Sequence, residues 1–191
     1  GQVFSIISDQ QGALLLGIYD DGLLKFNTRN EHIERIPLDM ADVDIITFFK
    51  ENDEKIWIGA EYGIYSYSNG TLRKEDEINR LLPDRSVYGI LRDKQGKLWI
   101  GTYGGLYRYN GTEFVWMDEY DSVRTVNCLY IDEEGRLWIG TNDDGLSIMI
   151  NETVVNVVSE KDGLPADTVK CITQGADGDY YIGTTGAMSV V

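Results

Sequence analysis

One short pattern of residues recurs five times along this chain of 191 residues. In each copy an apolar strand precedes an acidic turn, a second strand that ends near a glycine, and a third strand that begins with Gly-Leu or a similar pair. The spacings between the glycines of the second strand are 42, 42, 39 and 43 residues, and the glycines are Gly17, Gly59, Gly101, Gly140 and Gly183. A near-constant period of this length indicates one supersecondary unit copied side by side. The period therefore predicts architecture, and by itself it assigns no chemistry.

The third copy, residues 86–121, shows what one unit is expected to form. Apolar residues alternate along its first segment, which is typical of a strand, and Asp93-Lys-Gln-Gly96 then makes a tight turn. Asn110-Gly111 is a strong hairpin signal between the last two strands. The predicted strands cover residues 87–93, 97–102, 106–109 and 112–116. Four short antiparallel strands joined by tight turns make one blade of a β-propeller.

The other copies fit the same template, so we predict an all-β chain, a β-propeller built of four-stranded antiparallel blades. Four blades are complete and a fifth contributes three strands. Residues 74–82, charged and then apolar, indicate a connection between blades with one helical turn. The predicted blades cover residues 3–38, 45–74, 86–121, 125–158 and 168–191, in a single array over 1–191. Such small sheets bury their two apolar faces against their neighbours.

Three columns of the repeat are informative. The first strand carries one small residue in each copy, which we attribute to crowding near the propeller axis: Ser5, Thr47, Gly89, Cys128 and Cys171. The second strand carries a large side chain that we interpret as a wedge between adjacent blades: Leu15, Trp57, Trp99, Trp138 and Tyr181. The acidic turns offer one to three carboxylates each. Calcium loops need several more oxygen ligands converging in one loop, so an ordinary turn is the favoured interpretation.

The charge of the chain limits its partners. It has 17 Lys and Arg against 32 Asp and Glu, a net charge of −15. A field of this sign repels phosphate backbones and anionic membrane surfaces, so we expect no nucleic acid partner and no direct membrane docking. No apolar run reaches the roughly 20 residues of a membrane helix, and no signal peptide is recognised. Because the sequence begins and ends inside the repeat, we expect a piece of a longer protein.

The repeats resemble a known family. The segments that carry the resemblance are Leu98-Trp-Ile-Gly-Thr-Tyr-Gly-Gly-Leu-Tyr-Arg-Tyr109, Leu137-Trp-Ile-Gly-Thr-Asn-Asp-Asp-Gly-Leu146 and Asp162-Gly-Leu-Pro165. They are similar to the two-component regulator propeller repeat, and the similarity extends over nearly the whole chain, more weakly in the first and fifth copies. It implies a periplasmic sensor module of a hybrid two-component system from Bacteroides-like bacteria, attached to the inner membrane and to a histidine kinase by segments outside this sequence. Many such modules respond to glycan fragments.

The same resemblance implies a larger ring, since propellers of this family usually have about seven blades. We therefore expect a fragment of a larger propeller, with a closed five-blade ring as the alternative. Terminal blades that lack neighbours would expose apolar faces, so we also expect self-association through those blades, or a homodimer.

Catalysis finds little support in the sequence. His32, the one histidine, falls in the outer strand of the first blade, and neither cysteine has the spacing of a metal ligand. Cys128 and Cys171 are predicted as free thiols, with a disulfide between them as the alternative. We predict no cofactor, no metal and no enzymatic activity in this segment. A polysaccharide lyase or hydrolase stays as the least favoured alternative, because carboxylates are abundant.

Ligand binding is better supported. The loops between second and third strands emerge at the same end as the connections between blades, where propellers commonly bind ligands. Aromatic rings mixed with carboxylates, amides and guanidinium groups suit a small molecule such as an oligosaccharide. The predicted ligand-binding residues are Tyr19, Asp20, Asp21, Glu61, Tyr62, Arg85, Tyr103, Arg124, Asn142, Asp143 and Asp144, with Asp42, Asp44 and Asp167 beside them. A structural or dimerising propeller without its own ligand is the second hypothesis.

Overall fold

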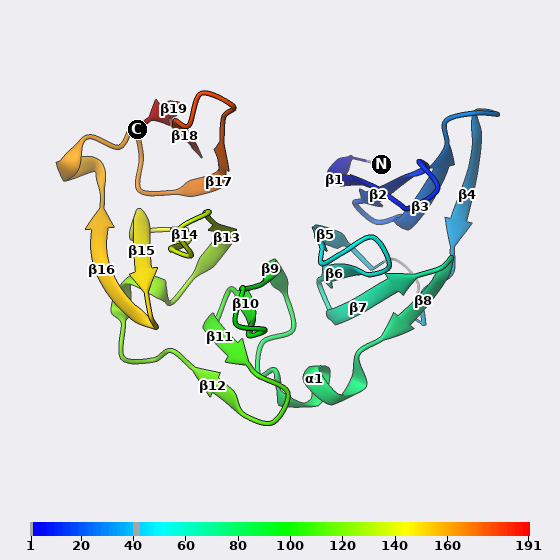
Figure 1. Cartoon of the computed structure of the whole chain (residues 1–191), viewed down its shortest axis with the longest axis horizontal. Helices are drawn as coiled ribbons and strands as arrows, with labels where there is room; N and C mark the ends of the chain where they lie inside the picture. The colour runs from blue at the N-terminus through cyan, green and yellow to red at the C-terminus, as the bar shows by residue number, and fades with distance from the viewer. Residues whose placement is uncertain (1, 40–42) are drawn as a thin grey trace. The chain divides into compact units, whose positions relative to one another are not determined.

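A computed structural model of the chain describes residues 2–39 and 43–191. The predicted fold class is confirmed. The described residues form four four-stranded antiparallel sheets and one three-stranded sheet, and each sheet is a propeller blade (Figure 1). The chain divides into two compact units, Gly1–Ile90 and Leu91–Val191.

The first unit holds two complete sheets in which every strand pairs with the next one along the chain. The first sheet consists of β1 (Val3–Ser8), β2 (Leu14–Ile18), β3 (Gly22–Asn27) and β4 (His32–Ile36). The second consists of β5 (Ile45–Lys50), β6 (Ile56–Ala60), β7 (Gly63–Ser68) and β8 (Thr71–Lys74). The short helix α1 (Asp76–Leu81) follows, where the sequence predicts one helical turn.

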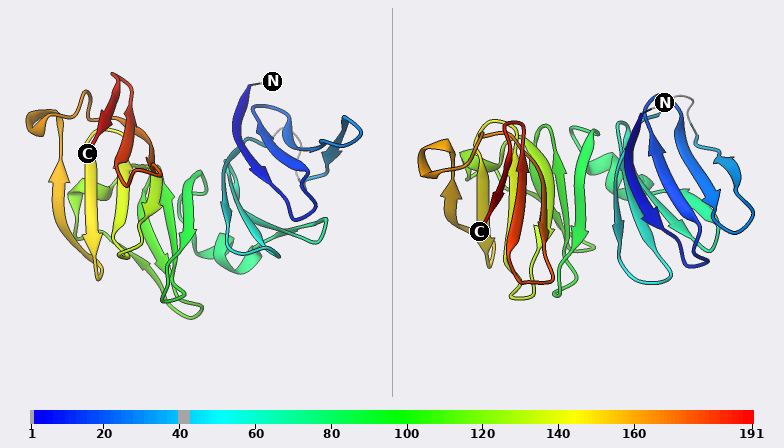
Figure 2. Two further views of the ribbon diagram at one scale, coloured as in Figure 1. Left: turned by 45° about the horizontal axis from the view of Figure 1, so that its top comes forward. Right: turned by 90° about the horizontal axis from the view of Figure 1, so that it is seen from above.

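The second unit holds the remaining strands, and its boundary with the first falls inside β9 (Val87–Arg92). The third sheet adds β10 (Leu98–Thr102), β11 (Gly105–Tyr109) and β12 (Phe114–Trp116). The fourth consists of β13 (Val126–Ile131), β14 (Leu137–Thr141), β15 (Leu146–Ile150) and β16 (Thr153–Val158). The fifth consists of β17 (Val169–Gln174), β18 (Tyr180–Thr184) and β19 (Met188–Val190). The strands of each sheet run side by side with the usual twist (Figure 2). Two 3₁₀ turns that the sequence does not predict, Asp121–Val123 and Glu160–Asp162, precede β13 and β17.

The joint between neighbouring sheets explains the recurring glycine. A Cβ atom built on Gly59 would lie 2.8 Å from Val87 Cγ1, and one on Gly140 would lie 2.7 Å from Val169 Cγ1. Normal carbon contacts are about 3.5–4.0 Å, so only glycine lets the next sheet approach this closely. We call the space over each of these glycines a glycine socket and the β-branched side chain that fills it a knob. Four sockets are filled in this way, Gly17 by Ile45, Gly59 by Val87, Gly101 by Val126 and Gly140 by Val169. All four knobs are completely buried.

The small residues of the first strand border the same sockets. A Cβ on Gly17 would lie 2.7 Å from Ser5 Oγ, and one on Gly59 would lie 2.6 Å from Thr47 Cγ2. Their size is therefore limited by close packing against the glycine of their own sheet, a more local cause than the axial crowding that the sequence suggested. A register shift follows the first residue of these strands, as in Ile45/Thr47 and Val126/Cys128. A bulge of this kind re-aims a side chain, and here it accompanies each knob whose pairing is described.

The carboxylates of the acidic turns are used by the fold. Asp93 Oδ1 accepts hydrogen bonds from the backbone N–H groups of Gln95 and Lys97, both at 2.9 Å, and Oδ2 accepts one from Trp99 Nε1 at 2.9 Å. The same pairing of turn carboxylate and indole joins Glu51 to Trp57 at 2.7 Å and Asp132 to Trp138 at 2.9 Å. These carboxylates thus close their own hairpins. Within residues 2–39 and 43–191 no cluster of ligands suited to a metal ion is found.

The wedge interpretation is confirmed for Trp138. Its ring stacks on Tyr180 of the next sheet at a centroid distance of 4.2 Å and an interplanar angle of 18°. Together with Leu146, Val169 and Ile182 it forms an apolar core between the fourth and fifth sheets. Trp57 instead lies under the ammonium group of Lys55, 3.7 Å from the ring centroid. The large side chains of this column therefore share a position but differ in what they contact.

Candidate functional site

In the first unit the predicted binding residues gather around Asp44, in the connection between the first two sheets. The backbone N–H of Asp20 donates to Asp44 Oδ1 at 2.8 Å, and the backbone N–H of Glu61 donates to the Asp44 carbonyl oxygen at 3.0 Å. One connection thus holds the β2–β3 loop and the β6–β7 loop. Asp20 has a left-handed backbone, with φ of 58°, which Asp adopts more readily than most residues.

The two tyrosines of this group present their rings to solvent. Tyr19 is 46% exposed and makes an edge-to-face contact with Phe4 at a centroid distance of 5.7 Å. Tyr62 is 41% exposed. A hydrogen bond to the Glu61 carboxylate, and the negative charges of Glu61 and Asp44, raise the pKa of the Tyr62 hydroxyl. Both rings therefore combine a free face with nearby carboxylates.

The other predicted residues of the first unit have different surroundings. Asp21 forms an ion pair with Arg35 of β4, which occupies its carboxylate. Arg85 is exposed in the segment that leads into β9, next to Ser86, whose hydroxyl donates to the Glu61 carbonyl oxygen at 3.3 Å. Asp42 lies outside the described residues. The first unit thus brings Tyr19, Asp20, Glu61 and Tyr62 to one set of loops and engages Asp21 elsewhere.

In the second unit Tyr103 is at the tip of the β10–β11 loop and is 59% exposed. Thr102 Oγ1 fixes this loop by accepting a hydrogen bond from the Gly104 N–H at 3.0 Å and donating one to the Gly105 carbonyl at 3.2 Å. A second aromatic ring lies beside the loop, since a Cβ on Gly105 would be 2.6 Å from Trp116 Nε1. Trp116 is 49% exposed and was not predicted as a binding residue. The sequence predicts Trp116 in an outer strand and not in a loop. It does not show that the side chain is exposed.

The β14–β15 loop carries the predicted residues Asn142, Asp143 and Asp144. Asn142 is anchored at its backbone, where its N–H donates to the Thr125 carbonyl at 3.0 Å and its carbonyl accepts from Thr168 Oγ1 at 2.6 Å. Its side-chain amide donates to Asp143 Oδ2 at 3.0 Å. The loop is thereby held by its backbone while its side chains stay near solvent.

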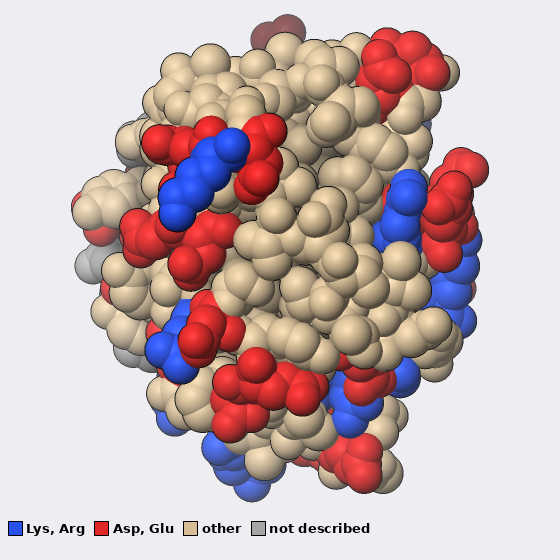
Figure 3. Space-filling view, turned by 90° about the vertical axis from the view of Figure 1, so that its left-hand side faces the viewer, with Lys and Arg blue, Asp and Glu red and all other residues tan. Residues whose placement is uncertain are grey.

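Several carboxylates meet at this loop. Burial raises the pKa of Asp144, and the negative charges of Asp143, Asp121 and Asp167 raise it further, while Arg124 partly opposes them. Arg124 is 66% exposed at its side chain and pairs with Asp121 at 2.5 Å. The group is an acidic cluster with one guanidinium beside it. Acidic side chains are also prominent on the face of the molecule in Figure 3, where they border a broad uncharged area.

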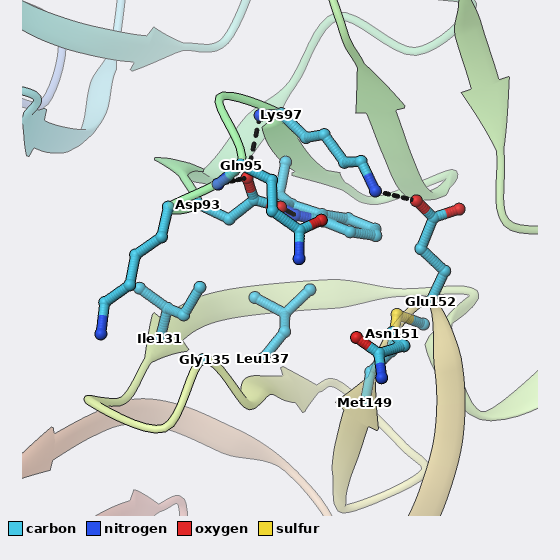
Figure 4. A pocket seen from close by; sticks show the side chains of 11 residues that line it. Asp93, Gln95, Lys97, Ile131, Gly135, Leu137, Met149, Asn151 and Glu152 are labelled. Carbon is cyan, nitrogen blue, oxygen red and sulfur yellow. Dashed lines mark hydrogen bonds and ion pairs between the residues drawn. The ribbon is translucent and has the colours of Figure 1, made fainter.

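The predicted residues therefore fall into two groups, one in each unit, at the ends of loops of the same kind. Their role in binding stays a prediction. The structure also shows a small cavity that the sequence did not suggest, about 60 Å³ in volume, between the third and fourth sheets (Figure 4). Trp99, Leu137 and Met149 line its apolar part.

An ion-pair cluster stands at the rim of this cavity. Glu152 accepts from Lys97 Nζ at 2.5 Å and from Arg108 Nη1 at 2.6 Å. These hydrogen bonds lower the pKa of Glu152. Asn151 and Glu152 both have positive φ, 48° and 65°, as the tight turn between β15 and β16 requires. The cluster joins two sheets, and we interpret it as structural.

Comparisons with known proteins find a family model and several solved structures that are similar to this chain. The model of the family described as "Two component regulator propeller" matches residues 81–104, which include β9 and β10, and residues 121–143, which include β13 and β14. The match covers less than half of the chain, so these two segments are similar to the repeat of that family. No curated protein matches the sequence.

Solved structures with this fold include the extracellular domain of a hybrid two component system and a lyase. The extracellular domain of BT3049, described as a hybrid two component system of B. thetaiotaomicron, is 25% identical, with a TM-score of 0.85 over 99% of this chain and 27% of that one. Virginiamycin B lyase from Staphylococcus aureus is 16% identical, with a TM-score of 0.71 over 99% and 69%. PorZ of Porphyromonas gingivalis is 16% identical, with a TM-score of 0.70 over 98% and 31%. The last two show the fold alone. The chain spans about a quarter of the length of the BT3049 domain.

Membrane attachment is not visible in the part of the chain that the structure describes. Its helices are too short and too polar for any of them to cross a bilayer.

Proposed function

We propose that this chain is part of the extracytoplasmic, periplasmic sensor region of a two-component signalling protein. The observation that carries the proposal is the combination of the family match with the likeness to the extracellular domain of BT3049 over 99% of this chain. In the proposal the propeller binds a ligand, and the full-length protein relays that event to a histidine kinase outside this segment.

We further propose that the ligand is a glycan fragment. A sugar offers hydroxyl groups, which pair with carboxylates and amides, and C–H faces, which pack on aromatic rings. The first unit supplies Tyr19 and Tyr62 beside Glu61 and Asp44. The second supplies the exposed rings of Tyr103 and Trp116, and a Cβ on Gly105 of the same loop would be 3.8 Å from the carbonyl oxygen of Arg124, whose charge acts on Asp144 of the acidic cluster. Each group therefore contains both kinds of partner.

Two other functions are compatible with the fold. A propeller that only supports or dimerises a larger receptor would keep the sheets and leave the loop side chains without a ligand. A lyase is the second, since virginiamycin B lyase has the same fold, but at 16% identity this likeness gives no catalytic residues to this chain.

The test is calorimetric titration of the chain with a panel of oligosaccharides. Tyr62→Ala and Tyr103→Ala probe the two groups separately, and we expect a loss of about two- to tenfold in affinity from the group that binds, because stacking on a ring contributes about 0.5–1.5 kcal/mol. Asp53→Ala is a matched control, since its side chain is 94% exposed in the β5–β6 turn, at the other end of its sheet. Unchanged affinity in both tyrosine variants would move the site elsewhere. No binding by any sugar would favour the structural propeller, and sugar cleavage would favour the lyase.

A further inference from the structure

The turn between β1 and β2 differs from its counterparts in the next three sheets. In those sheets a long cationic side chain follows the turn and a tryptophan stands two residues later, as in Lys55–Trp57, Lys97–Trp99 and Arg136–Trp138. The first sheet has Ala13 and Leu15 at these two places. Its backbone is the same, because Asp9 Oδ1 accepts from the Ala13 N–H at 2.9 Å as Asp93 Oδ1 does from the Lys97 N–H. The turn is therefore kept while two large side chains are replaced by smaller ones.

The missing side chains leave room beside Ala13. In the second sheet the ammonium group of Lys55 covers the Trp57 ring at 3.7 Å. In the third sheet Lys97 reaches Glu152, and the cavity beside this pair has a volume of only about 60 Å³. The cavity beside Ala13 has a volume of about 320 Å³. Pockets for small molecules have volumes of about 300–1,000 Å³, so this cavity has room for one small ligand.

The lining of this cavity is polar. It belongs to the first unit and to the face of the first sheet that packs on the second sheet, since Lys25 pairs with both Leu15 and Glu34, and Leu15 is part of the core between these sheets. The side chains that supply its polar atoms include Gln11, Lys25, Asn27, Arg29, His32 and Glu34. Water or a polar molecule is the expected occupant of such a cavity.

Two walls of the cavity are held in place by the protein itself. Lys25 Nζ pairs with Asp9 Oδ2 at 3.0 Å and donates to the hydroxyl of Tyr67 in the second sheet at 3.2 Å. The side chains of Lys25 and Asp9 are only 14% and 4% exposed. Thr28 Oγ1 donates to the Gly12 carbonyl at 3.2 Å and so joins the β3–β4 turn to the β1–β2 turn. A ligand would therefore meet walls that are already ordered, which lowers the entropic cost of binding.

Three other charged or ionisable side chains of the lining are exposed: Arg29, His32 and Glu34. Among the residues that the structure describes, none forms a hydrogen bond or an ion pair with these three side chains. The third sheet differs, because its cations Lys97 and Arg108 both pair with Glu152. A guanidinium group is permanently charged and binds a carboxylate through two parallel hydrogen bonds, an imidazole donates one more, and a carboxylate accepts from hydroxyl groups.

We propose that this cavity binds a small hydroxylated carboxylic acid of the size of one sugar acid. Its carboxylate lies on Arg29 and His32, and its hydroxyl groups donate to Glu34. A doubly charged phosphate fits less well, because Glu34 and the net charge of −15 repel it. The β1–β2 and β3–β4 turns are at the opposite end of β2 and β3 from the β2–β3 loop that carries Tyr19. The site is therefore separate from that loop, and the proposal does not rest on the function proposed above.

Proton NMR locates the ligand directly. His32 is the one histidine of the chain, so its ring protons report on this cavity and on no other. At constant ionic strength, D-galacturonate should shift these signals in a saturable way. D-galactose, which lacks the carboxylate, should bind at least tenfold more weakly, because hydrogen bonds to a charged group contribute more than neutral ones. Equal binding of the two sugars, or no shift with galacturonate, would overturn the proposal.

Two variants test the cavity itself by the same titration. Arg29→Gln should weaken galacturonate binding at least tenfold. Ala13→Lys restores the side chain of the sister turns, so it should fill the cavity and abolish binding, while its backbone N–H still donates to Asp9 and the circular dichroism spectrum stays unchanged. Arg80→Gln removes the same charge from an exposed position on α1 and should have no effect.

Arg29→Gln decides the matter if Ala13→Lys fails to fold, because the Arg29 side chain is exposed and the sheet does not depend on it. Parental affinity in Arg29→Gln, or in a folded Ala13→Lys, would show that galacturonate binds elsewhere. An equal loss in Arg80→Gln would show that the net charge of the chain, and not this cavity, determines the affinity.

Discussion

A methyl group added at Gly140 offers a sharp test of the joint between sheets. The new Cβ of Gly140→Ala would be 2.7 Å from Val169 Cγ1 and 3.1 Å from Val169 Cβ. Val169 is completely buried, and a β-branched side chain has little rotamer freedom with which to move aside. Its methyl group would have to retreat by about 0.8 Å to restore a normal carbon contact. The fourth and fifth sheets would therefore have to separate slightly.

The size of the effect follows from two opposing terms. Overpacking of a core typically costs about 1–3 kcal/mol. Replacing glycine by alanine at an ordinary backbone conformation stabilises the folded protein by about 0.4–1 kcal/mol, because alanine lowers the conformational entropy of the unfolded chain. We expect Gly140→Ala to lose about 0–2.6 kcal/mol of unfolding free energy, or up to about 10 °C in Tm for a chain of this size.

Gly183→Ala is the matched control, because its Cβ would meet only the sulfur of an exposed side chain. Its stability should stay the same or rise by up to about 1 kcal/mol. Urea unfolding followed by tryptophan fluorescence, at concentrations where the chain is monomeric, gives the midpoint urea concentration of each variant. The midpoints can be compared if the unfolding free energies of both variants fall with urea at the same slope. If the two variants unfold at the same urea concentration, the recurring glycine is not a socket for the next sheet.

Four further predictions follow from the polar side chains. Glu152→Gln should cost about 1–2 kcal/mol at pH 7, since it weakens hydrogen bonds to two cations, and Glu119→Gln, at an exposed carboxylate, should cost nothing measurable. Because the pKa of Glu152 is lowered, the loss of stability caused by Glu152→Gln should have its full size above the ordinary pKa of 4.5 and should disappear as the pH falls through the lowered pKa. Urea unfolding of the parent and the variant at several pH values measures this loss. Asp132→Asn should cost about 2–3 kcal/mol, because an amide has one acceptor oxygen and cannot replace both Oδ1, which accepts from the Arg136 backbone N–H, and Oδ2, which accepts from Arg136 Nε and Trp138 Nε1; a loss below 0.5 kcal/mol by the same assay would contradict its role. Asp144→Asn should instead raise Tm at pH 7, with the gain declining once the pH falls below the raised pKa and lost below the ordinary value of 3.8, and a lower Tm would contradict the repulsion inferred there. A thiol reagent should modify Cys171 quickly and Cys128 only after unfolding; rapid reaction of both in the native chain would show that Cys128 is accessible.

The repeat could be read from the sequence because its signals are local. Turn residues such as Asp93 and Gly96 determine where hairpins close, and alternation determines where strands run, so the strands of the third sheet end within two residues of their predicted bounds. Packing between sheets is not local. The sequence shows that Gly140 recurs, but only the structure shows that Val169 requires it.

The same limit applies to the candidate site. The sequence correctly places Tyr62 and Tyr103 on exposed loops, because loop position follows from the hairpins. It does not show that Asp21 pairs with Arg35, whose strand is two elements away. It also misses Trp116, since strand alternation does not tell whether the last residue of an outer strand is covered.

The carboxylates of this chain divide by the end of the sheet that carries them. Asp132, in the β13–β14 hairpin, is buried and accepts several hydrogen bonds, and its pKa, which burial alone would raise, is lowered by the donors of Arg136 and Trp138. Asp144, in a loop at the opposite end of β14, has a raised pKa and lies among like charges. A fold gains stability from the first arrangement and loses it in the second. Groups that a protein keeps at a cost to its stability are more often retained for binding than for folding. This contrast, which is independent of any relative, favours the loop end as the place to look for a ligand.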